Sequence, residues 1–125
     1  MPQAPGDTLG ADVAVDGSGN AIAVWTQGET FYEGWGPPPP SDIWANRLSA
    51  GSGWGIPVLL DRGDRTNFPS PQVAIDAQGN AIAVWQYDPD GDERGVPAVI
   101  RASRFSVNTG WGPVSVIGSG AFDAN

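Results

Sequence analysis

Short apolar runs separated by turn residues recur along the chain in a fixed order. The run at 13–15 is followed by an Asp-x-x-Gly-Asn turn and then by Ala-Ile-Ala-Val-Trp at 21–25, and all three return at 73–85. The two copies are offset by 60 positions and differ at three of thirteen residues. A duplication of this kind indicates a repeat architecture, in which one unit buries its apolar face against another copy of itself.

Each copy predicts four short antiparallel strands. In the first copy the predicted strands are 13–16, 21–27, 43–49 and 57–61; in the second they are 73–76, 81–87, 99–106 and 114–117. The Gly-Asn pair that ends each first turn tolerates the positive φ of a tight hairpin. Because Ala-Ile-Ala-Val-Trp is small or apolar on both faces, we expect this strand to be covered on both sides. Four-stranded antiparallel units with a period near 60 residues are typical of β-propeller blades.

The repeat divides the chain into two predicted blades. The expected segments are a lead-in at 1–10, a first blade at 11–61, an inter-blade loop at 62–70, a second blade at 71–118, and a lead-out toward a next blade at 119–125. A propeller has roughly four to eight blades, so two blades leave the ring open. We therefore expect homo-oligomerisation to complete it, with six blades from a trimer favoured over eight from a tetramer. The alternative is a segment cut from a longer array.

The charge and composition exclude several classes of partner. Fourteen acidic residues oppose six Arg, and the net charge of −8 argues against nucleic acid and anionic membranes. The absence of Cys excludes disulfides and thiolate metal sites. No apolar window approaches the roughly 20 residues of a membrane span, and residues 1–5 show no signal-peptide pattern. Neutral ligands and cations remain as possible binding partners.

The third strand of each copy ends in a Gly-rich turn followed by Trp. Residues 49–54 (SAGSGW) and 106–111 (SVNTGW) resemble the Asp-box hairpin of sialidase-like β-propellers, the bacterial neuraminidase repeat. Both are two residues shorter than Ser-x-Asp-x-Gly-x-Thr-Trp, and Gly51 and Asn108 stand in place of the Asp. The resemblance implies a propeller fold in which this turn is structural, with Trp54 and Trp111 clasping the blade. If the source is a secreted bacterial propeller, it also favours an extracellular or cell-surface location.

Positions shared by both copies are candidates for blade structure. Trp25 and Trp85 match each other, and we expect both to build the core of their blade. Arg47 and Arg104 also match. Two interpretations stay open for this pair: a structural role, or one binding site in each blade.

The copies diverge most between their second and third strands. The first copy has aromatic and acidic residues there, followed by four Pro, whereas the second has an acidic stretch. Flat aromatic rings pack on the C–H groups of sugars, while carboxylates and Arg hydrogen-bond the hydroxyls, in keeping with mostly apolar ligand sites. The predicted glycan-binding residues are Phe31, Tyr32, Glu33, Trp35, Arg47, Arg65 and Arg104. The alternative is that the rings cover a hydrophobic seam or an inter-chain contact.

The second copy carries alternating carboxylates at Asp88, Asp90 and Asp92. Calcium prefers oxygen ligands in such a pattern, which resembles the opening of an EF-hand loop. Glu93 replaces the sharp-turn Gly and Val99 the bidentate Glu, so an EF-hand is excluded. A calcium-stabilised turn and a solvated acidic turn both remain, and we expect no other cofactor.

Catalysis has little support in the sequence. Without His, Cys or Lys the usual nucleophile–base pairs are missing, so we name no catalytic residue. Glu29, Glu33 and Asp42 keep carboxylate-pair glycoside hydrolysis open. Sialidases use an Arg cluster and a Tyr–Glu pair, which the adjacent Tyr32 and Glu33 do not reproduce. The sequence thus favours a non-catalytic, lectin-like binding module; the alternatives are a structural or interaction module without a ligand, and a sialidase-like hydrolase fragment.

Overall fold

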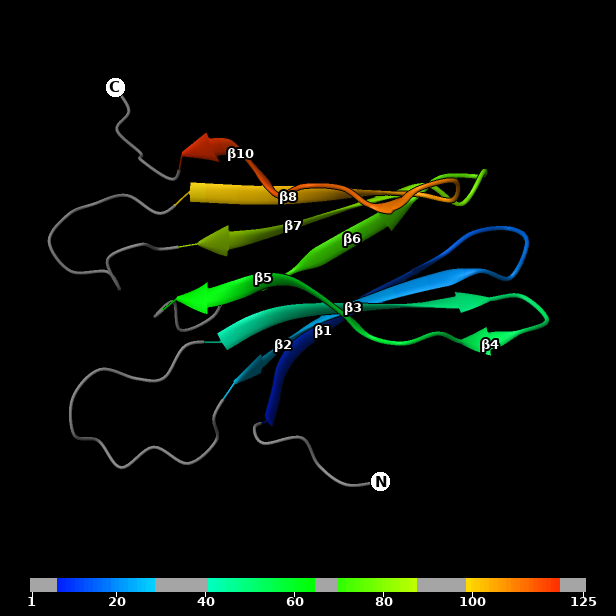
Figure 1. The fold of residues 1–125 in the computed structure, drawn as a ribbon, viewed down its shortest axis with the longest axis horizontal. Helices are drawn as coiled ribbons and strands as arrows, with labels where there is room; N and C mark the ends of the chain where they lie inside the picture. The colour runs from blue at the N-terminus through cyan, green and yellow to red at the C-terminus, as the bar shows by residue number, and fades with distance from the viewer. Residues whose placement is uncertain (1–6, 29–40, 65–69, 88–98, 120–125) are drawn as a thin grey trace, which may run out of the picture.

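A computed structural model describes residues 7–28, 41–64, 70–87 and 99–119. Every regular element in these ranges is a β-strand, and the strands form two antiparallel sheets that follow one another along the chain (Figure 1). The predicted all-β class and the division into two repeated sheets are confirmed. Among the described residues, no helix is long and apolar enough to cross a membrane.

Each sheet is a four-stranded meander with a two-residue strand added at the end of its third strand. The N-terminal sheet contains β1 (Asp7–Val15), β2 (Ala21–Gly28), β3 (Ser41–Ser49), β5 (Val58–Asp64) and the short β4 (Gly53–Trp54). The C-terminal sheet contains β6 (Gln72–Ile75), β7 (Ala81–Tyr87), β8 (Val99–Ser106), β10 (Ser115–Ser119) and the short β9 (Gly110–Trp111).

Two strands, β1 and β5, extend three or more residues beyond their predicted ends. β1 begins at Asp7, because a register shift between Thr8 and Gly10 lets it continue pairing with β2 as far as Gly28. β5 extends to Asp64 in the same way, through shifts in its pairing with β3. Both extensions lie at the same end of the N-terminal sheet.

The repeated Asp-x-x-Gly-Asn motif closes the first hairpin of each sheet. Asp16 Oδ1 accepts hydrogen bonds from the backbone N–H groups of Ser18 at 2.8 Å and Asn20 at 3.0 Å. Asp76 makes the same two bonds in the second copy, to Gln78 at 2.9 Å and Asn80 at 3.0 Å. Gly19 and Gly79 take the positive φ (93° and 90°) that the turn requires.

The Asn of the motif also connects two hairpins, a role that the sequence did not reveal. Asn20 Oδ1 accepts a hydrogen bond from the N–H of Ala50, and Asn80 Oδ1 accepts one from Val107. In each sheet the β3–β4 or β8–β9 turn is therefore tied to the first hairpin. These turns lie together at one end of the molecule (Figure 1).

The hydrophobic core lies between the two sheets. Residues directly opposite in an antiparallel pair share a face, so the strand registers define which side chains point inward. From β2 and β3 the core takes Ile22, Val24, Ile43 and Ala45, and from β7 it takes Ala81, Ala83 and Trp85. The backbone N–H of Val73 also donates to Asp12 Oδ2 across the interface, at 3.0 Å.

The two sheets use opposite faces of the repeat to make this core. Ile22 and Val24 of the N-terminal sheet point toward the C-terminal sheet. Their repeat counterparts, Ile82 and Val84, point away from the core, and it is the alternate residues of β7, Trp85 included, that point inward. The sheets therefore stack head to tail: the Ala-Ala-Trp face of the second sheet covers the Ile-Val face of the first.

Candidate binding surfaces

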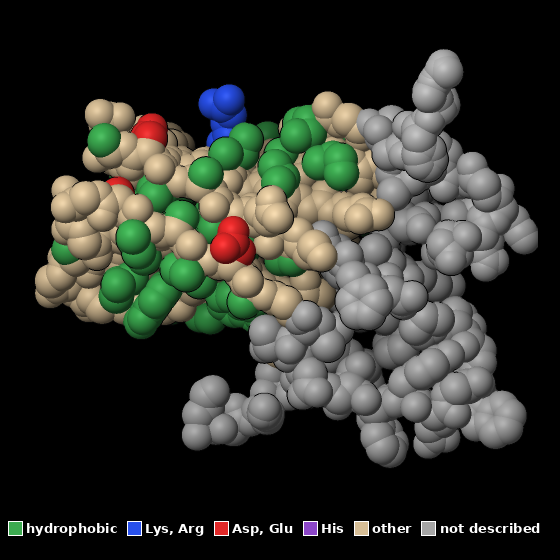
Figure 2. Space-filling view, turned by 180° about the vertical axis from the view of Figure 1, so that it is seen from behind, with side chains coloured by type: hydrophobic (Ala, Val, Ile, Leu, Met, Phe, Trp, Pro, Cys, Tyr) green, Lys and Arg blue, Asp and Glu red, His purple; other side chains and the backbone are tan. Residues whose placement is uncertain are grey.

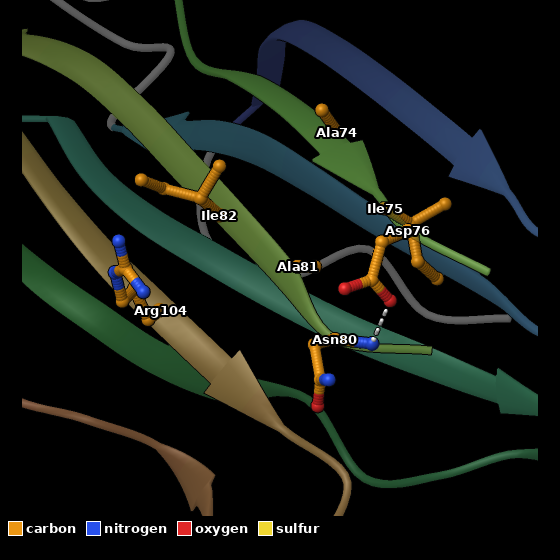
Figure 3. Close-up of a pocket in the computed structure, with 7 residues that line it drawn as sticks. All are labelled: Ala74, Ile75, Asp76, Asn80, Ala81, Ile82 and Arg104. Atoms are coloured by element: carbon orange, nitrogen blue, oxygen red, sulfur yellow. Dashed lines mark hydrogen bonds between the residues drawn. The ribbon is translucent and has the colours of Figure 1, made fainter. Parts of the chain in front are cut away.

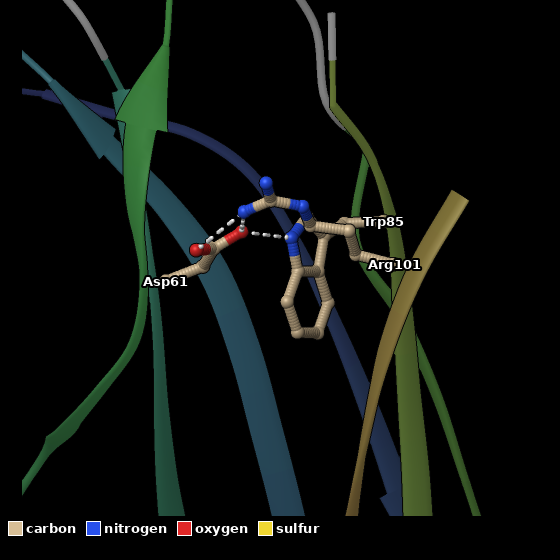
Figure 4. Close-up of polar contacts among 3 residues, drawn as sticks. All are labelled: Asp61, Trp85 and Arg101. Atoms are coloured by element: carbon tan, nitrogen blue, oxygen red, sulfur yellow. Dashed lines mark hydrogen bonds and ion pairs between the residues drawn. The ribbon is translucent and has the colours of Figure 1, made fainter. Parts of the chain in front are cut away.

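A polar cluster joins the sheets near the end opposite the hairpin turns. Asp61 on β5 accepts a hydrogen bond from Trp85 Nε1 on β7 at 2.8 Å (Figure 4). It also accepts bonds from Arg101 Nη1 on β8, which lies 3.0 Å from both carboxylate oxygens. The Asp61 side chain is only 12% exposed and that of Arg101 25%, so this ion pair is largely shielded from water.

Tyr87 completes the cluster. The Arg101 guanidinium carbon lies 3.5 Å from the centroid of the Tyr87 ring, a cation–π contact at the last residue of β7. Because Asp61 binds protein donors with both of its oxygens, the cluster fixes strand ends of the two sheets and offers no free carboxylate for acid–base chemistry.

Sequence reasoning missed this cluster, although the repeat contained a signal for it. By repeat alignment Gly118 stands where Asp61 does, and Trp44 stands where Arg101 does. Two charges of opposite sign thus appear at positions that the other copy leaves uncharged. Unmatched charges of this kind are candidates for a contact that only one interface makes.

A pocket of about 290 Å³ opens on the outward face of the C-terminal sheet (Figure 3). Its lining combines Ala and Ile residues of β6 and β7 with the hairpin turn and one Arg from β8: Ala74, Ile75, Asp76, Asn80, Ala81, Ile82 and Arg104. A second pocket, of about 310 Å³, shares Ile82 and Arg104 and continues toward Ile117. These volumes lie near the lower end of the range for small-ligand sites.

The two predicted Arg residues occupy different environments. Arg104 is exposed and lines both pockets. Arg47 lies between the sheets, where its guanidinium carbon is 5.3 Å from the centroid of the Phe105 ring and Nη1 donates to Ser49 Oγ. The repeat therefore does not give these two residues equal access to a ligand.

The four predicted structural Trp residues also differ between the copies. Trp85 is 2% exposed, whereas Trp25 is half-buried and donates to Gln27 at 3.2 Å. Trp111 packs against Phe105 with ring centroids 5.3 Å apart, while Trp54 is 53% exposed. In both pairs the residue of the C-terminal sheet is the better covered.

The other candidate residues lie outside the described ranges. For glycan binding these are Phe31, Tyr32, Glu33, Trp35 and Arg65, and for calcium they are Asp88, Asp90 and Asp92. Within the described ranges, no group of three or more His, Cys, Asp or Glu side chains is placed to hold a metal ion.

Asp16 has a lowered pKa. The main cause is the hydrogen bond from the side chain of Asn20, 3.0 Å from Oδ2, and the backbone N–H of Asn20 adds to it. Bonds to a carboxylate favour its charged form. The turn thus holds a carboxylate that remains ionised in mild acid.

Comparison with protein-family models, with curated proteins and with solved structures found no match. The resemblance to sialidase-like repeats accordingly rests on the sequence motifs alone.

Proposed function

We propose that this chain is a non-catalytic, lectin-like binding module of the β-propeller type, with its binding surface at the end opposite the hairpin turns and with glycans as ligands. One observation carries the proposal. The two copies can be aligned through their strands and turns, and they diverge most in the segments 29–40 and 88–98. The strand ends that flank both segments lie at the same end of the two sheets (Figure 1).

The shared strands and turns can thus serve as a scaffold, and the divergent segments as its variable part. Binding residues concentrate on loops that a rigid scaffold positions. The Asp61–Arg101 pair and the Tyr87 ring stiffen the scaffold at this end. The divergent segments supply three aromatic rings beside carboxylates in the first copy and an acidic stretch in the second. A net charge of −8 is compatible with neutral sugars.

A glycan screen with a matched pair of variants tests the proposal. Trp35→Ala removes a ring from the divergent segment, whereas Ile56→Ala removes an apolar side chain that is 84% exposed on the connection between β4 and β5. We expect the wild-type chain and Ile56→Ala to bind the same glycans and Trp35→Ala to lose at least tenfold in affinity.

Absence of glycan binding by the wild-type chain, with its native circular dichroism intact, would refute the proposal, as would equal losses in the two variants. Hydrolysis of a bound glycoside that disappears on Glu33→Gln would replace it with the hydrolase alternative.

A further inference from the structure

The contact between the two sheets shows how one repeat binds the next. Because the sheets stack head to tail, one face of each sheet remains without a partner sheet in the single chain. On the N-terminal sheet, the uncovered face carries the residues that align with the buried face of the C-terminal sheet. On the C-terminal sheet, the uncovered face carries the residues that align with the buried face of the N-terminal sheet.

Exposed hydrophobic residues of the N-terminal sheet occupy positions that the C-terminal sheet covers. Three of them stand out: Val13 at 57%, Val15 at 67% and Trp54 at 53% exposed. Their repeat counterparts all pack against the hydrophobic core: Val73, Ile75 and Trp111. Single exposed apolar residues are normal, but a set that matches an existing interface position by position indicates a missing partner.

The outward face of the C-terminal sheet likewise exposes residues whose repeat counterparts are buried in the N-terminal sheet. Ile117 is 58% exposed, whereas its counterpart Leu60 packs against the core. Ile82 lines both pockets, whereas Ile22 is fully buried. In the view from behind, hydrophobic side chains are scattered among polar side chains and backbone over the described surface (Figure 2).

The internal interface also shows what would fill the pocket around Arg104. On the N-terminal sheet the counterpart of this pocket surrounds Arg47. Phe105 occupies it, with its ring centroid 5.3 Å from the Arg47 guanidinium carbon. The turn at Gly79 lies beside it, since a Cβ there would be 3.6 Å from Asp16 Oδ2 and 3.9 Å from Arg47 Nη2.

We infer that the occupant of the pocket is a second copy of this chain, bound through the outward face of its N-terminal sheet. Leu48 then takes the position of Phe105 beneath Arg104, and the Gly19 turn takes the position of the Gly79 turn beside Asp76. This is a heterologous contact, because two different faces bind each other. Repetition of the contact adds sheets in one direction until they close into a ring; three chains, with six sheets, fall within the roughly four to eight blades of a propeller, and this assembly does not depend on glycan binding.

The contact between chains is weaker than the contact within a chain. The internal interface contains the shielded Asp61–Arg101 ion pair and the Trp85 hydrogen bond. The contact between copies has Gly118 and Trp44 at the positions that correspond to Asp61 and Arg101, so it lacks this cluster. The assembly therefore dissociates on dilution before the chains unfold.

Two single variants, alone and mixed, test the direction of the contact. Val13→Glu places a carboxylate on the outward face of the N-terminal sheet, and Arg104→Glu reverses the charge on the outward face of the C-terminal sheet. Both residues are exposed in the single chain, so each variant keeps its fold. We expect the wild-type chain to show three times the 13.0 kDa mass of one chain by light scattering, and each variant alone to show one.

Mixing the two variants gives the decisive result. Each retains one intact face, and the two intact faces are complementary, so an equimolar mixture forms a dimer that does not grow further. A wild-type chain that stays monomeric and folded overturns the inference, because the uncovered faces then bind something else or nothing. Dimerisation of either variant alone overturns it too, since a face would then bind its own kind. If Arg104→Glu is misfolded by circular dichroism, Ile82→Glu replaces it on the same face, with the same expected results.

Discussion

The second strands of the two sheets, β2 and β7, begin with the same five residues, yet matching residues have different surroundings. Ile22 is fully buried, whereas Ile82 lines a pocket. Trp85 is almost fully buried and bonds to Asp61, whereas Trp25 is half-buried and bonds to Gln27 within its own strand. The burial of each residue thus depends on whether its side of the sheet packs against the other sheet, and only secondarily on the residue type.

The comparison also separates what is general from what is particular. The hairpin turns and the Asn hydrogen bonds that tie them together occur in both copies, and each sheet packs one apolar face into the core. Among the described residues, the cluster of Asp61, Trp85, Tyr87 and Arg101 occurs once, at the interface inside the chain. It is what distinguishes the permanent contact from the contact that we infer between chains.

The largest expected difference is between Ile22→Ala and Ile82→Ala. Truncation of a fully buried Ile removes core contacts and leaves a cavity, which costs about 2–5 kcal/mol of unfolding free energy. At concentrations where chains are monomeric, Ile82→Ala has no partner sheet to lose and costs less than half as much. Urea unfolding of dilute samples measures both; equal losses would contradict the assignment of the two faces.

Asp61→Asn tests the cluster that only the internal interface has. The substitution removes the charge opposite Arg101 and leaves a shielded guanidinium without its ion-pair partner, at a cost of about 1–3 kcal/mol. A double-mutant cycle with Arg101→Gln supplies the control, because coupled residues give a combined loss smaller than the sum. If the two losses of unfolding free energy simply add, the Asp61–Arg101 pair has no coupling energy.

Substitution of the turn glycines has a smaller effect. Gly79→Ala forces a Cβ into a backbone with φ of 90° and to within 3.0 Å of Val107 Cγ1. The left-handed conformation alone costs about 1–2 kcal/mol. Gly19→Ala has the same backbone cost and a looser contact, 3.3 Å from Ala50 Cβ, so we expect Gly79→Ala to lower the melting temperature more. The reverse order would mean that a Cβ at position 79 is not more tightly packed against Val107 than one at position 19 is against Ala50.

The smallest effect concerns pH. Because the fold lowers the pKa of Asp16, it favours the ionised carboxylate, and this stabilisation is fully present above the unfolded-state pKa. It is lost as the pH falls below about 4 and through the lowered pKa. Unfolding free energies at pH 7 and pH 3 should therefore differ more for the wild-type chain than for Asp16→Asn. An identical pH dependence in the two would refute the role of Asp16.

Much of this fold could be predicted from the sequence, because many of its turns and strands depend on residues that lie close together in the chain. The Asp-x-x-Gly-Asn hairpins and the strands 81–87 and 99–106 follow from turn chemistry and apolar runs within a few residues. The start of β1 was wrong because Thr8, Leu9 and Gly10 have no strand pattern, and only pairing with β2 makes them a strand. The inward face of each sheet was not predictable, because Ala-Ile-Ala-Val-Trp is apolar on both sides. The Asp61 cluster joins residues 24 and 40 positions apart, beyond the reach of any local pattern.

The native mass of the wild-type chain, followed by light scattering through a dilution series, tests the central claim most directly. The six-sheet ring that we propose predicts three times 13.0 kDa at high concentration and one chain at low concentration, with unchanged circular dichroism throughout. A folded chain that remains at 13.0 kDa at every concentration would contradict the account, because the faces that match the internal interface would then have no affinity for each other.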